Sequence, residues 1–415
     1  MRRAGVEEER PALKCPIRKM MTLEGITVVD LTQNVAGPYC TQLLGDFGAT
    51  VIKIERPDGG DDVRQFAPLW HGESAPYLCY NRNKSSVCID LSHPRGPEIV
   101  RRLAKDADIL VHSMKPGSAE SHGLGYEQLR AENPRLIYGS ISGFGDRGPL
   151  RSLPGYDPLG QAYSGIISVN GHPASPPARV VVPIIDMGSG LWLFSGILAA
   201  LLDRAKTGSG AKVAASLLET GVTWTTLLMT NYQANGEVPG PAGSTSPAAA
   251  PYEAFATSDT GWVLIAAGND RLFTKLCSVL GCPALATDPR FASNPDRVAR
   301  REELHALLEA ETRRYRVDEL IRLLREAQVP ASRINSIAEV FADEQVNALE
   351  MFPPVHPDFR IPEMKFVDIP VSINGEKSVK RLMPPRLGEQ TETILRQAGY
   401  SDRELEILRS EKVIN

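Results

Sequence analysis

Asp186 is the side chain of this sequence best placed to act as a nucleophile. It follows the apolar run VVVPII (180–185), which predicts a strand, and precedes the small residues Gly188-Ser189-Gly190 of a predicted helix. A carboxylate at a helix N-terminus beside small residues is open to a substrate carbonyl, which it can attack. The same place suits an N-cap, which accepts hydrogen bonds from backbone N–H groups and thereby lowers its own pKa. The pattern alone leaves both roles open.

Polar residues at the ends of predicted strands form a second group of candidates. Open α/β sheets bind their ligands at the carboxyl ends of the strands, so residues there are candidate ligand contacts. Arg56 and Lys84 suit phosphate groups, Arg as a bidentate fork and Lys as a point charge. Both are also typical of solvated charges at strand ends, and the pattern leaves that alternative open. The candidates are Asn34, Val35, Arg56, Lys84, Ser113 and Met114.

Several common catalytic motifs are absent from the sequence. Residues 33–38 read QNVAGP after the first predicted strand, so the GxGxxG dinucleotide fingerprint is missing. There is no Walker loop, HExxH or GxSxG, and the seven histidines have no metal-ligand spacing. No metal site is therefore predicted.

The elements that position these residues alternate between strands and helices in the first half of the chain. Strands are expected at 26–32, 49–55, 85–91, 108–113 and 135–144, with helical patterns between them. Strands separated by helices of about a dozen residues indicate βαβ crossovers and a mostly parallel sheet. The sequence therefore predicts an α/β fold, with a sheet covered on both faces because its strands are continuously apolar.

The second half has a different character. Residues 235–251 are rich in Gly, Pro, Ser and Ala, as in a linker or an active-site loop. A hairpin is expected from 252–257 and 261–267, and helices at 269–280, 298–313 and 317–327. A Pro-rich stretch and two closing helices follow. This pattern predicts a smaller α+β region.

Composition excludes several classes of protein. The 415 residues carry 46 basic and 50 acidic side chains, a net charge of 46 − 50 = −4, which argues against a duplex DNA binder. The 42% hydrophobic content argues against a disordered chain. Six cysteines without a CxxC pair favour reduced thiols and a cytoplasmic location.

The sequence predicts neither a targeting peptide at the N-terminus nor a membrane span in its most apolar stretch. Residues 1–21 have no apolar core for a signal peptide and are expected to form a poorly ordered extension. The apolar stretch 180–202 contains Pro183 and Asp186, which favours a buried helix over a membrane span.

The sequence resembles the family III CoA-transferases, which include formyl-CoA and carnitine CoA-transferases, over essentially everything after residue 22. The opening motif of that family is similar to residues 23–64, and further matching motifs follow in the same order. They are NRNKSSVCIDL (81–91), KPGSAESHGLGYEQL (115–129), NPRLIYGSISGFGDRGP (133–149), PGYDPLGQAYSG (154–165), DMGSGLWLFSGILAALLDRAKTGSGAKV (186–213), VPASRINSIAEVFADEQV (329–346) and LGEQTETIL (387–395).

The resemblance implies that Asp186 is the catalytic aspartate. Its carboxylate would attack an acyl-CoA thioester and carry CoA to a free carboxylic acid through anhydride and thioester intermediates. It also implies that Arg56 and Lys84 contact CoA phosphates, and that Ser113 and Met114 line the CoA path. Asn34, Val35 and Ala36 would form the loop beside the reacting carbonyl. Coenzyme A is thus expected as a substrate, with no permanently bound cofactor.

The resemblance further implies a fold and an assembly. A Rossmann-like large domain would be built from residues 22–230 and a returning C-terminal segment, 346–415. The linker and small domain would occupy 231–345 between them, after the extension at 1–21. Two chains would interlock as rings in a homodimer, with no nucleic acid or membrane as partner.

Departures from the family pattern bear on the substrate. Val35 stands where some members carry a glutamine, and Ser121 and Ser142 stand where some carry an arginine and a lysine for CoA phosphate. Formyl-CoA transferase uses those residues, so oxalate and formate are disfavoured. The run Gly-Asp-Asp-Val-Arg (60–64) is similar to that of transferases acting on succinyl-CoA and other dicarboxylates.

Two other functions are alternatives. The α-methylacyl-CoA racemases share this sequence pattern but carry a histidine where this chain has Tyr156, and a glutamate near residues 268–270. A phenol titrates near pH 10 and is a poor substitute for an imidazole acid–base group. A non-catalytic acyl-CoA-binding protein is the third possibility, and the presence of Asp186 argues against it. Trp192 and Cys40 are expected in the core.

Overall fold

The computed structural model of the chain describes residues 21–353, 359–378 and 382–415. The extension expected at the N-terminus lies, but for its last residue, outside the described residues. The chain divides into two compact units. The first, called the large unit here, combines the residues up to 160 with 182–224 and 350–415, and the second, the small unit, combines 161–181 with 225–349. Residues 161–181 and 225–230, expected in the large domain, and residues 346–349, expected in the C-terminal segment, group with the small unit.

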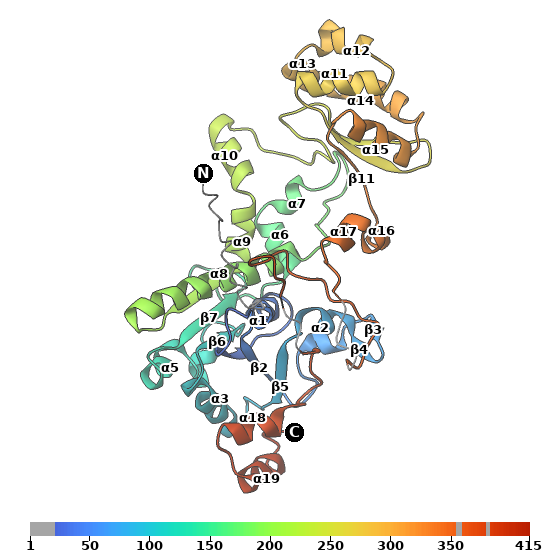
Figure 1. The fold of residues 1–415 in the computed structure, drawn as a ribbon. Coiled ribbons are helices and arrows are strands. Elements are labelled where there is room, and N and C mark those ends of the chain that lie inside the picture. The colour runs from blue at the N-terminus through green and yellow to red at the C-terminus, as the bar shows by residue number, and fades with distance from the viewer. Residues whose placement is uncertain (1–20, 354–358, 379–381) are drawn as a thin grey trace, which may run out of the picture. The chain divides into compact units, whose positions relative to one another are not determined.

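The large unit contains a six-stranded sheet whose neighbouring strands are all parallel (Figure 1). Its order is β5-β2-β1-β6-β7-β8, so the chain builds outward from β1 in one direction and then from β6 in the other. The topological switch point, where such sheets bind ligands, therefore lies between β1 and β6. The strands are β1 (Thr27–Leu31), β2 (Thr50–Glu55), β5 (Lys84–Cys88), β6 (Ile109–His112), β7 (Ile137–Ser142) and β8 (Lys212–Ser216).

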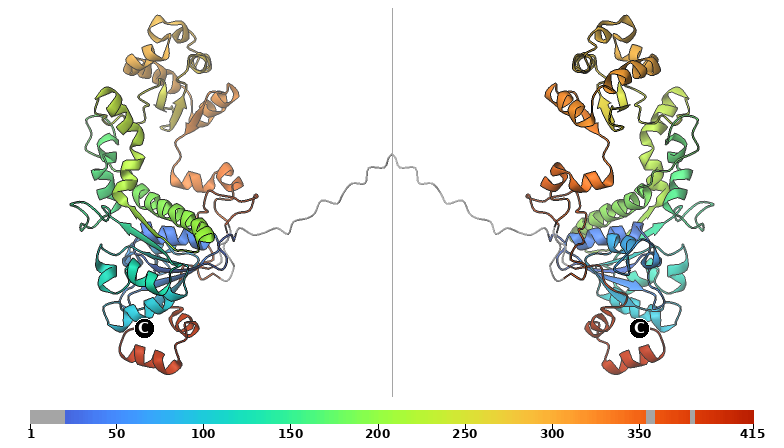
Figure 2. Two further views of the ribbon diagram at one scale, coloured as in Figure 1. Left: turned by 90° about the vertical axis from the view of Figure 1, so that its left-hand side faces the viewer. Right: turned by 90° about the vertical axis from the view of Figure 1, so that its right-hand side faces the viewer.

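Helices cover both faces of this sheet, as the continuously apolar strands predict. On one face, α1 (Ala36–Asp46) packs on α8 (Ile184–Thr207), and α8 in turn contacts β7 and β8. The other face carries α3 (Arg95–Lys105), α5 (Tyr126–Glu132) and the two closing helices, α18 (Thr391–Gln397) and α19 (Asp402–Ser410). Figure 2 shows the closing helices beside the first half of the chain in both views. Side chains such as Leu103, Leu129, Leu395 and Leu408 form one core with the sheet.

One strand prediction is wrong. The run VVVPII is not a strand, because Pro183 interrupts it and Val181 and Val182 are 79% and 56% exposed. The sixth strand is β8 instead, whose residues KVAAS are too small and polar to give a clear strand pattern. It pairs with β7 at the edge of the sheet.

Helix α8 is long and apolar enough to cross a membrane by length and composition, with a hydropathy of 1.7 over its most apolar window. It contacts α1, α9, β7 and β8, so it serves as a covering helix of the sheet. Only 44% of that window is buried. Trp192 is 47% exposed, so its predicted core position is wrong for the single chain, whereas Cys40 is fully buried as expected.

The remaining elements of the large unit are short. They are η1 (Asp62–Gln65), β3 (Leu69–Trp70), β4 (Glu73–Ser74), α2 (Ala75–Tyr80), α4 (Ser118–Ser121), α6 (Asp157–Tyr163, which runs into the small unit) and α9 (Leu217–Trp224).

The small unit is built on the predicted hairpin. Its three-stranded antiparallel sheet has the order β11-β10-β9, and Phe255, Val263 and Ile265 of this sheet pack against leucines of the surrounding helices. The elements are α7 (Ile166–Val169), α10 (Thr226–Asn235), β9 (Tyr252–Ala256), β10 (Trp262–Ala266), α11 (Asp270–Val279), α12 (Ala284–Thr287), η2 (Pro289–Phe291), α13 (Asn294–Ala299), α14 (Arg301–Thr312), α15 (Val317–Glu326), β11 (Ala331–Arg333), α16 (Ile337–Ala342) and α17 (Glu344–Ala348).

Candidate active site

The predicted site residues converge on one hollow at the switch point of the sheet. This hollow, which we call the central hollow, has a volume of about 280 Å³ and lies where β1, β6 and β7 end. Its walls include most of the residues singled out from the sequence, and only Arg56 and Lys84 are missing from them. The predicted residues that line it are Asn34, Val35, Ala36, Ser113, Met114 and Asp186.

Asp186 is not the N-cap of its helix, so that interpretation is wrong. Helix α8 begins at Ile184, and Pro183 occupies the cap position without a side-chain hydrogen bond. The capping carboxylate is Asp157, whose Oδ2 accepts hydrogen bonds from the N–H groups of Ile185 at 2.8 Å and Asp186 at 3.2 Å. Asp157 does the structural task and leaves the Asp186 carboxylate available to a ligand.

Burial raises the pKa of Asp186 to about 7, and the nearby Asp157 carboxylate adds to the increase. The direction is opposite to the one expected for an N-cap. A helix N-terminus favours a carboxylate, but desolvation outweighs that effect here. A carboxyl group that titrates near neutrality in a hollow is typical of a functional site.

The first turn of α1 forms another wall of the central hollow, which Asp186 also lines. Val35, Ala36 and Gly37 line it, and their amide N–H groups donate no hydrogen bond within the described part of the chain. Such groups at a helix start are donors for an anion or a developing negative charge. Gly190 of α8 allows this arrangement, because a Cβ there would lie 2.4 Å from the Ala36 carbonyl oxygen.

The loop that leads into α1 is held from both sides. Asn34 has a left-handed backbone with φ of 66°, and its N–H donates to Asp61 Oδ1 at 3.1 Å. The N–H of Gln33 donates to Ser113 Oγ at 3.0 Å. Ser113 therefore fixes the loop and still has its own hydroxyl proton to donate to a ligand.

Arg56 lies beside the central hollow but is already paired. Its guanidinium donates to the Asp58 carbonyl at 2.7 Å and to Asp62 Oδ1 at 2.5 Å, and Asp62 is a lining residue. The Arg56 side chain is 44% exposed. It can reach a ligand at this rim by exchanging an exposed ion pair of small worth.

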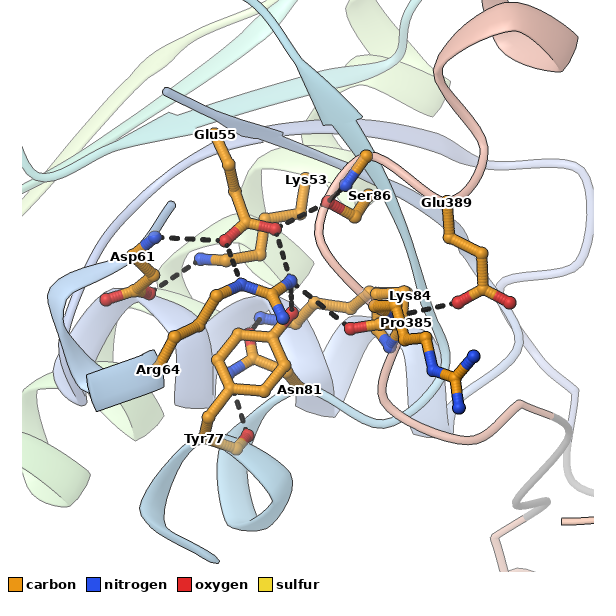
Figure 3. A network of polar contacts seen from close by, with 12 residues as sticks. Lys53, Glu55, Asp61, Arg64, Tyr77, Asn81, Lys84, Ser86, Pro385 and Glu389 are labelled. Carbon is orange, nitrogen blue, oxygen red and sulfur yellow. Dashed lines mark hydrogen bonds and ion pairs between the residues drawn. The ribbon is translucent and has the colours of Figure 1, made fainter. Parts of the chain in front are cut away.

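Lys84 is in a different environment from the one that phosphate contact requires. Its side chain is fully buried, and its ammonium donates to Asp30 at 3.1 Å, to the Pro38 carbonyl at 3.0 Å and to Asn81 Oδ1 at 3.0 Å. Figure 3 shows it inside a network of buried charges. The predicted contact with a CoA phosphate is not supported by this position, and Lys84 braces the first turn of α1 instead.

A second hollow, which we call the basic hollow, adjoins the central one. It has a volume of about 360 Å³, and the two share Met114, Lys115, Pro116, Ile141 and Ser142 as walls. Three exposed cations line it, namely Lys115, Arg151 and Lys212, together with the carboxylates Glu120 and Asp146. Burial lowers the pKa of its His112 to about 4, so that imidazole is neutral at pH 7.

These cations and Asp157 were missed in the sequence. Lys115 directly follows the predicted pair Ser113-Met114, which is a local signal. Arg151, Lys212 and Asp157 come from other segments, and only the folded sheet brings them to this edge.

The residues that separate a transferase from a racemase are also placed. Tyr156 lines the central hollow and is exposed. It follows Gly155, whose backbone lies so close to Gly143 that a Cβ would approach the Gly143 Cα to 2.2 Å. In the small unit, Asn269 caps α11 through a hydrogen bond from the N–H of Leu272, and Asp270 pairs with the buried Arg297.

Comparisons with known proteins identify the family of this chain. The family model for CoA-transferase family III matches residues 23–391. A succinate–glutarate CoA-transferase of Agrobacterium fabrum is 39% identical over 79% of this chain and 83% of its own length. An acetyl-CoA:oxalate CoA-transferase of Acetobacter aceti is 37% identical over 81% of this chain and 86% of its own.

A solved structure extends the likeness to three dimensions. A CAIB/BAIF family protein from Brucella suis superimposes with a TM-score of 0.83 and 36% identity, covering 92% of this chain and all of that one. The chain belongs to CoA-transferase family III.

Proposed function

We propose that this enzyme moves CoA from an acyl-CoA thioester to a dicarboxylic acid through covalent intermediates on Asp186. The observation that carries the proposal is the half-buried Asp186 carboxylate, which is free of capping duty and faces the same hollow as the amide donors of α1. A carboxylate nucleophile keeps the energy of the thioester in a second activated acyl group, provided that water is kept out.

The chemical steps balance without any further reagent. An oxygen of Asp186 attacks the thioester carbonyl, the C–S bond breaks, and CoA leaves as a thiolate while an acyl–aspartyl anhydride remains. The thiolate then attacks the aspartyl carbonyl, which releases the donor acid and leaves an aspartyl-CoA thioester. The acceptor carboxylate attacks the aspartyl carbonyl of that thioester, the C–S bond breaks, and CoA leaves again as a thiolate while a second anhydride remains. The thiolate then attacks the acceptor-derived carbonyl of this second anhydride, which forms acceptor-CoA and releases the Asp186 carboxylate.

The amide donors of α1 have a distinct task in these steps. Each attack places negative charge on a carbonyl oxygen, and the N–H groups of Val35, Ala36 and Gly37 are preorganised donors for that charge. Because Val35 has no amide side chain, the backbone donors carry this role in our proposal.

The substrate class rests mainly on the relatives. Their names specify succinate, glutarate and oxalate, all of them dicarboxylic acids. The run 60–64 contributes less than the sequence suggested, because Asp61 and Arg64 are engaged with Lys53 and Glu55 in the interior. The 37% identity to an oxalate enzyme also weighs against excluding oxalate. The acceptor is therefore proposed at the level of a dicarboxylate.

The decisive experiment combines an acceptor panel with trapping of the intermediate. Succinyl-CoA is incubated with dicarboxylates of two to six carbons, and the new CoA thioesters are identified by mass spectrometry. Under turnover, hydroxylamine is expected to convert Asp186 into a hydroxamate, because it attacks the activated aspartyl carbonyl. Asp186→Ala is expected to fold and to transfer no CoA.

Two results would contradict this mechanism. One is Asp186→Ala with near-wild-type transfer, and the other is an active enzyme that forms no hydroxamate. Exchange of the substrate α-proton with deuterated water, without CoA transfer, would instead support the racemase alternative.

We also propose that the basic hollow binds the phosphates of CoA. Three cations beside the central hollow suit the charged end of a long substrate whose thioester lies at Asp186. Lys115→Ala/Arg151→Ala is expected to raise the KM for acyl-CoA by about tenfold and to leave kcat within about threefold. The reason is that the phosphate contacts stabilise the bound substrate and the transition state equally, so their loss weakens binding and not the chemical step. Steady-state kinetics at two salt concentrations measure this.

The matched control is Lys105→Ala, which removes an exposed lysine from α3 on the other face of the sheet. Its KM is expected to stay unchanged. A double variant with an unaltered KM would rule out phosphate binding at the basic hollow.

The assembly proposed is an interlocked homodimer. In the large unit, Leu191, Trp192 and Trp224 leave apolar surface exposed on α8 and α9. In the small unit, α10 has no buried residue at all, although Leu227, Met229 and Tyr232 lie on it. Exposed clusters of large apolar side chains are typical of subunit interfaces, and a second copy of the chain is the occupant we propose.

A further inference from the structure

A buried ion pair lies directly beneath the loop that forms one wall of the central hollow. Lys53 of β2 and Asp61 are 2.9 Å apart, and both side chains are completely buried. Lys53 also donates to the Thr32 carbonyl at 2.8 Å. Asp61 Oδ1 accepts the N–H of Asn34 at 3.1 Å and that of Val63 at 3.2 Å. The pair therefore holds the loop at Thr32, through Lys53, and at Asn34, through Asp61.

The loop needs such a grip because its backbone is unfavourable at Asn34. A φ of 66° is left-handed, which costs most residues other than glycine about 1–2 kcal/mol and asparagine less. The turn reverses the chain just before α1 begins at Ala36. If Asn34 relaxed to an ordinary φ, the amide groups of the following three residues would turn away from the central hollow.

Stability alone does not explain the choice of side chains. A buried ion pair pays a large desolvation cost, and well-packed hydrophobic residues of similar volume often stabilise a fold as much or more. A hydrocarbon side chain, however, cannot accept the Asn34 N–H. The pair sits among further buried charges, including Glu55 and Arg64 (Figure 3), and of these Asp61 is the residue bonded to the Asn34 amide.

We propose that Asp61, paired with Lys53, is a positioning residue for the reaction: it holds Asn34 in its left-handed turn so that the first-turn amides of α1 face the reacting carbonyl. This inference rests on the proposed function for its kinetic consequence, but the loop geometry itself does not. It gives the first aspartate of the run 60–64 a task that concerns the rate of transfer and not the choice of acid.

Two double variants isolate the hydrogen bond from the charge. Lys53→Met/Asp61→Asn keeps the Oδ1 acceptor, whereas Lys53→Met/Asp61→Leu removes it, and neither leaves an unpaired buried charge. We expect kcat within about threefold of wild type for the first, and about 10- to 100-fold lower for the second, since misplaced oxyanion donors cost that much. The KM for succinyl-CoA is expected to stay within about threefold in both.

Amide hydrogen exchange provides a readout that needs no activity. In the ligand-free protein, the amides of Gln33 and Asn34, which are the hydrogen-bonded ones in this loop, are expected to exchange faster in the Leu variant than in the Asn variant. If the wild-type protein transferred CoA to no acid, the proposed function would fail, and the exchange comparison would still decide whether Asp61 holds the loop.

The control is Asp46→Asn, at the other end of α1. Asp46 forms a similarly buried ion pair with Arg82, and its carboxylate accepts hydrogen bonds from Arg82 and Asn83 and not from the loop. It is expected to lower the Tm and leave kcat unchanged. Equal kcat in the two double variants, or equal exchange of the Gln33 and Asn34 amides, would overturn the proposal. So would a loss of kcat in Asp46→Asn as large as in the Leu variant.

Discussion

At the scale of single residues, the site depends on a division of labour between two aspartates. Asp157 accepts the first amides of α8, which leaves Asp186 with a carboxylate that is half-buried and has no capping bond. Burial of this carboxyl group raises its pKa to about 7, so it keeps its proton up to about that pH. The proposed nucleophile is thus only partly ionised near neutral pH.

Activity should follow this titration. Because the carboxylate is the attacking form, kcat/KM is expected to rise about tenfold per pH unit below 7 and to level off above it. A pH–rate profile of the free enzyme between pH 5 and 9 measures the pKa. A profile flat from pH 5 to 7 would contradict a raised pKa at Asp186.

The same titration makes a prediction about stability. The folded state holds this proton up to about pH 7, while an unfolded aspartate releases it near 3.8, so the carboxyl group lowers stability as pH rises through that window. Asp186→Asn removes the effect. At pH 8 it is expected to be more stable than wild type by on the order of 2 kcal/mol, after a discount for partial exposure. Denaturation near pH 4 should show no such difference.

At the scale of elements, the contact between α1 and α8 sets the geometry of the site. The two helices approach so closely at Gly190 that there is no room for a side chain against the Ala36 carbonyl. The small residues after Asp186 are therefore a packing requirement as well as an opening for substrate.

Gly190→Ala tests that contact. The added methyl must push the first turn of α1 away, which should cost about 1–3 kcal/mol of stability and lower kcat more than KM. Denaturant unfolding and steady-state kinetics measure the two effects. Gly240→Ala is the control, since a Cβ there meets nothing within 4 Å. Wild-type kcat in Gly190→Ala would show that the helix contact does not position the amides.

The sequence predicts most elements of the fold but not the long-range polar pairs. Five strands, the hairpin and the closing helices follow from local apolar patterns, which report burial directly. Lys84 was predicted to be a phosphate ligand because no local pattern indicates its buried partner Asp30, which lies 54 residues away in the sequence. The capping of α8 by Asp157, over 28 and 29 residues, was equally hidden. Asp186 lies at a helix start, as the sequence predicts. Its pKa is raised and not lowered, because burial by residues distant in the sequence outweighs the effect of the helix N-terminus.

At the scale of the whole molecule, the exposed apolar surfaces give a prediction about assembly. Leu227, Met229 and Tyr232 of α10 would be an aggregation hazard in a monomer, so an assembly should cover them. Light scattering after size exclusion is expected to give twice the chain mass of 45.2 kDa. Leu227→Glu should weaken the dimer, because it buries a charge. A monodisperse monomer at micromolar concentration would contradict the proposal.

The closing segment also governs how the large unit is made. The amides of Ser86 and Cys88 on the edge strand β5 donate to the side chains of Gln390 and Thr391, and the amide of Asp90 donates to the Val413 carbonyl. Val413 and Ile414 are buried in the main core. During synthesis, the first half of the chain therefore has an open core and an uncovered sheet edge until the segment that includes Val413 and Ile414 has been made. Deletion of residues 387–415 would keep Asp186 and the loop before α1 in the sequence, but it would remove the side chains that close the main core.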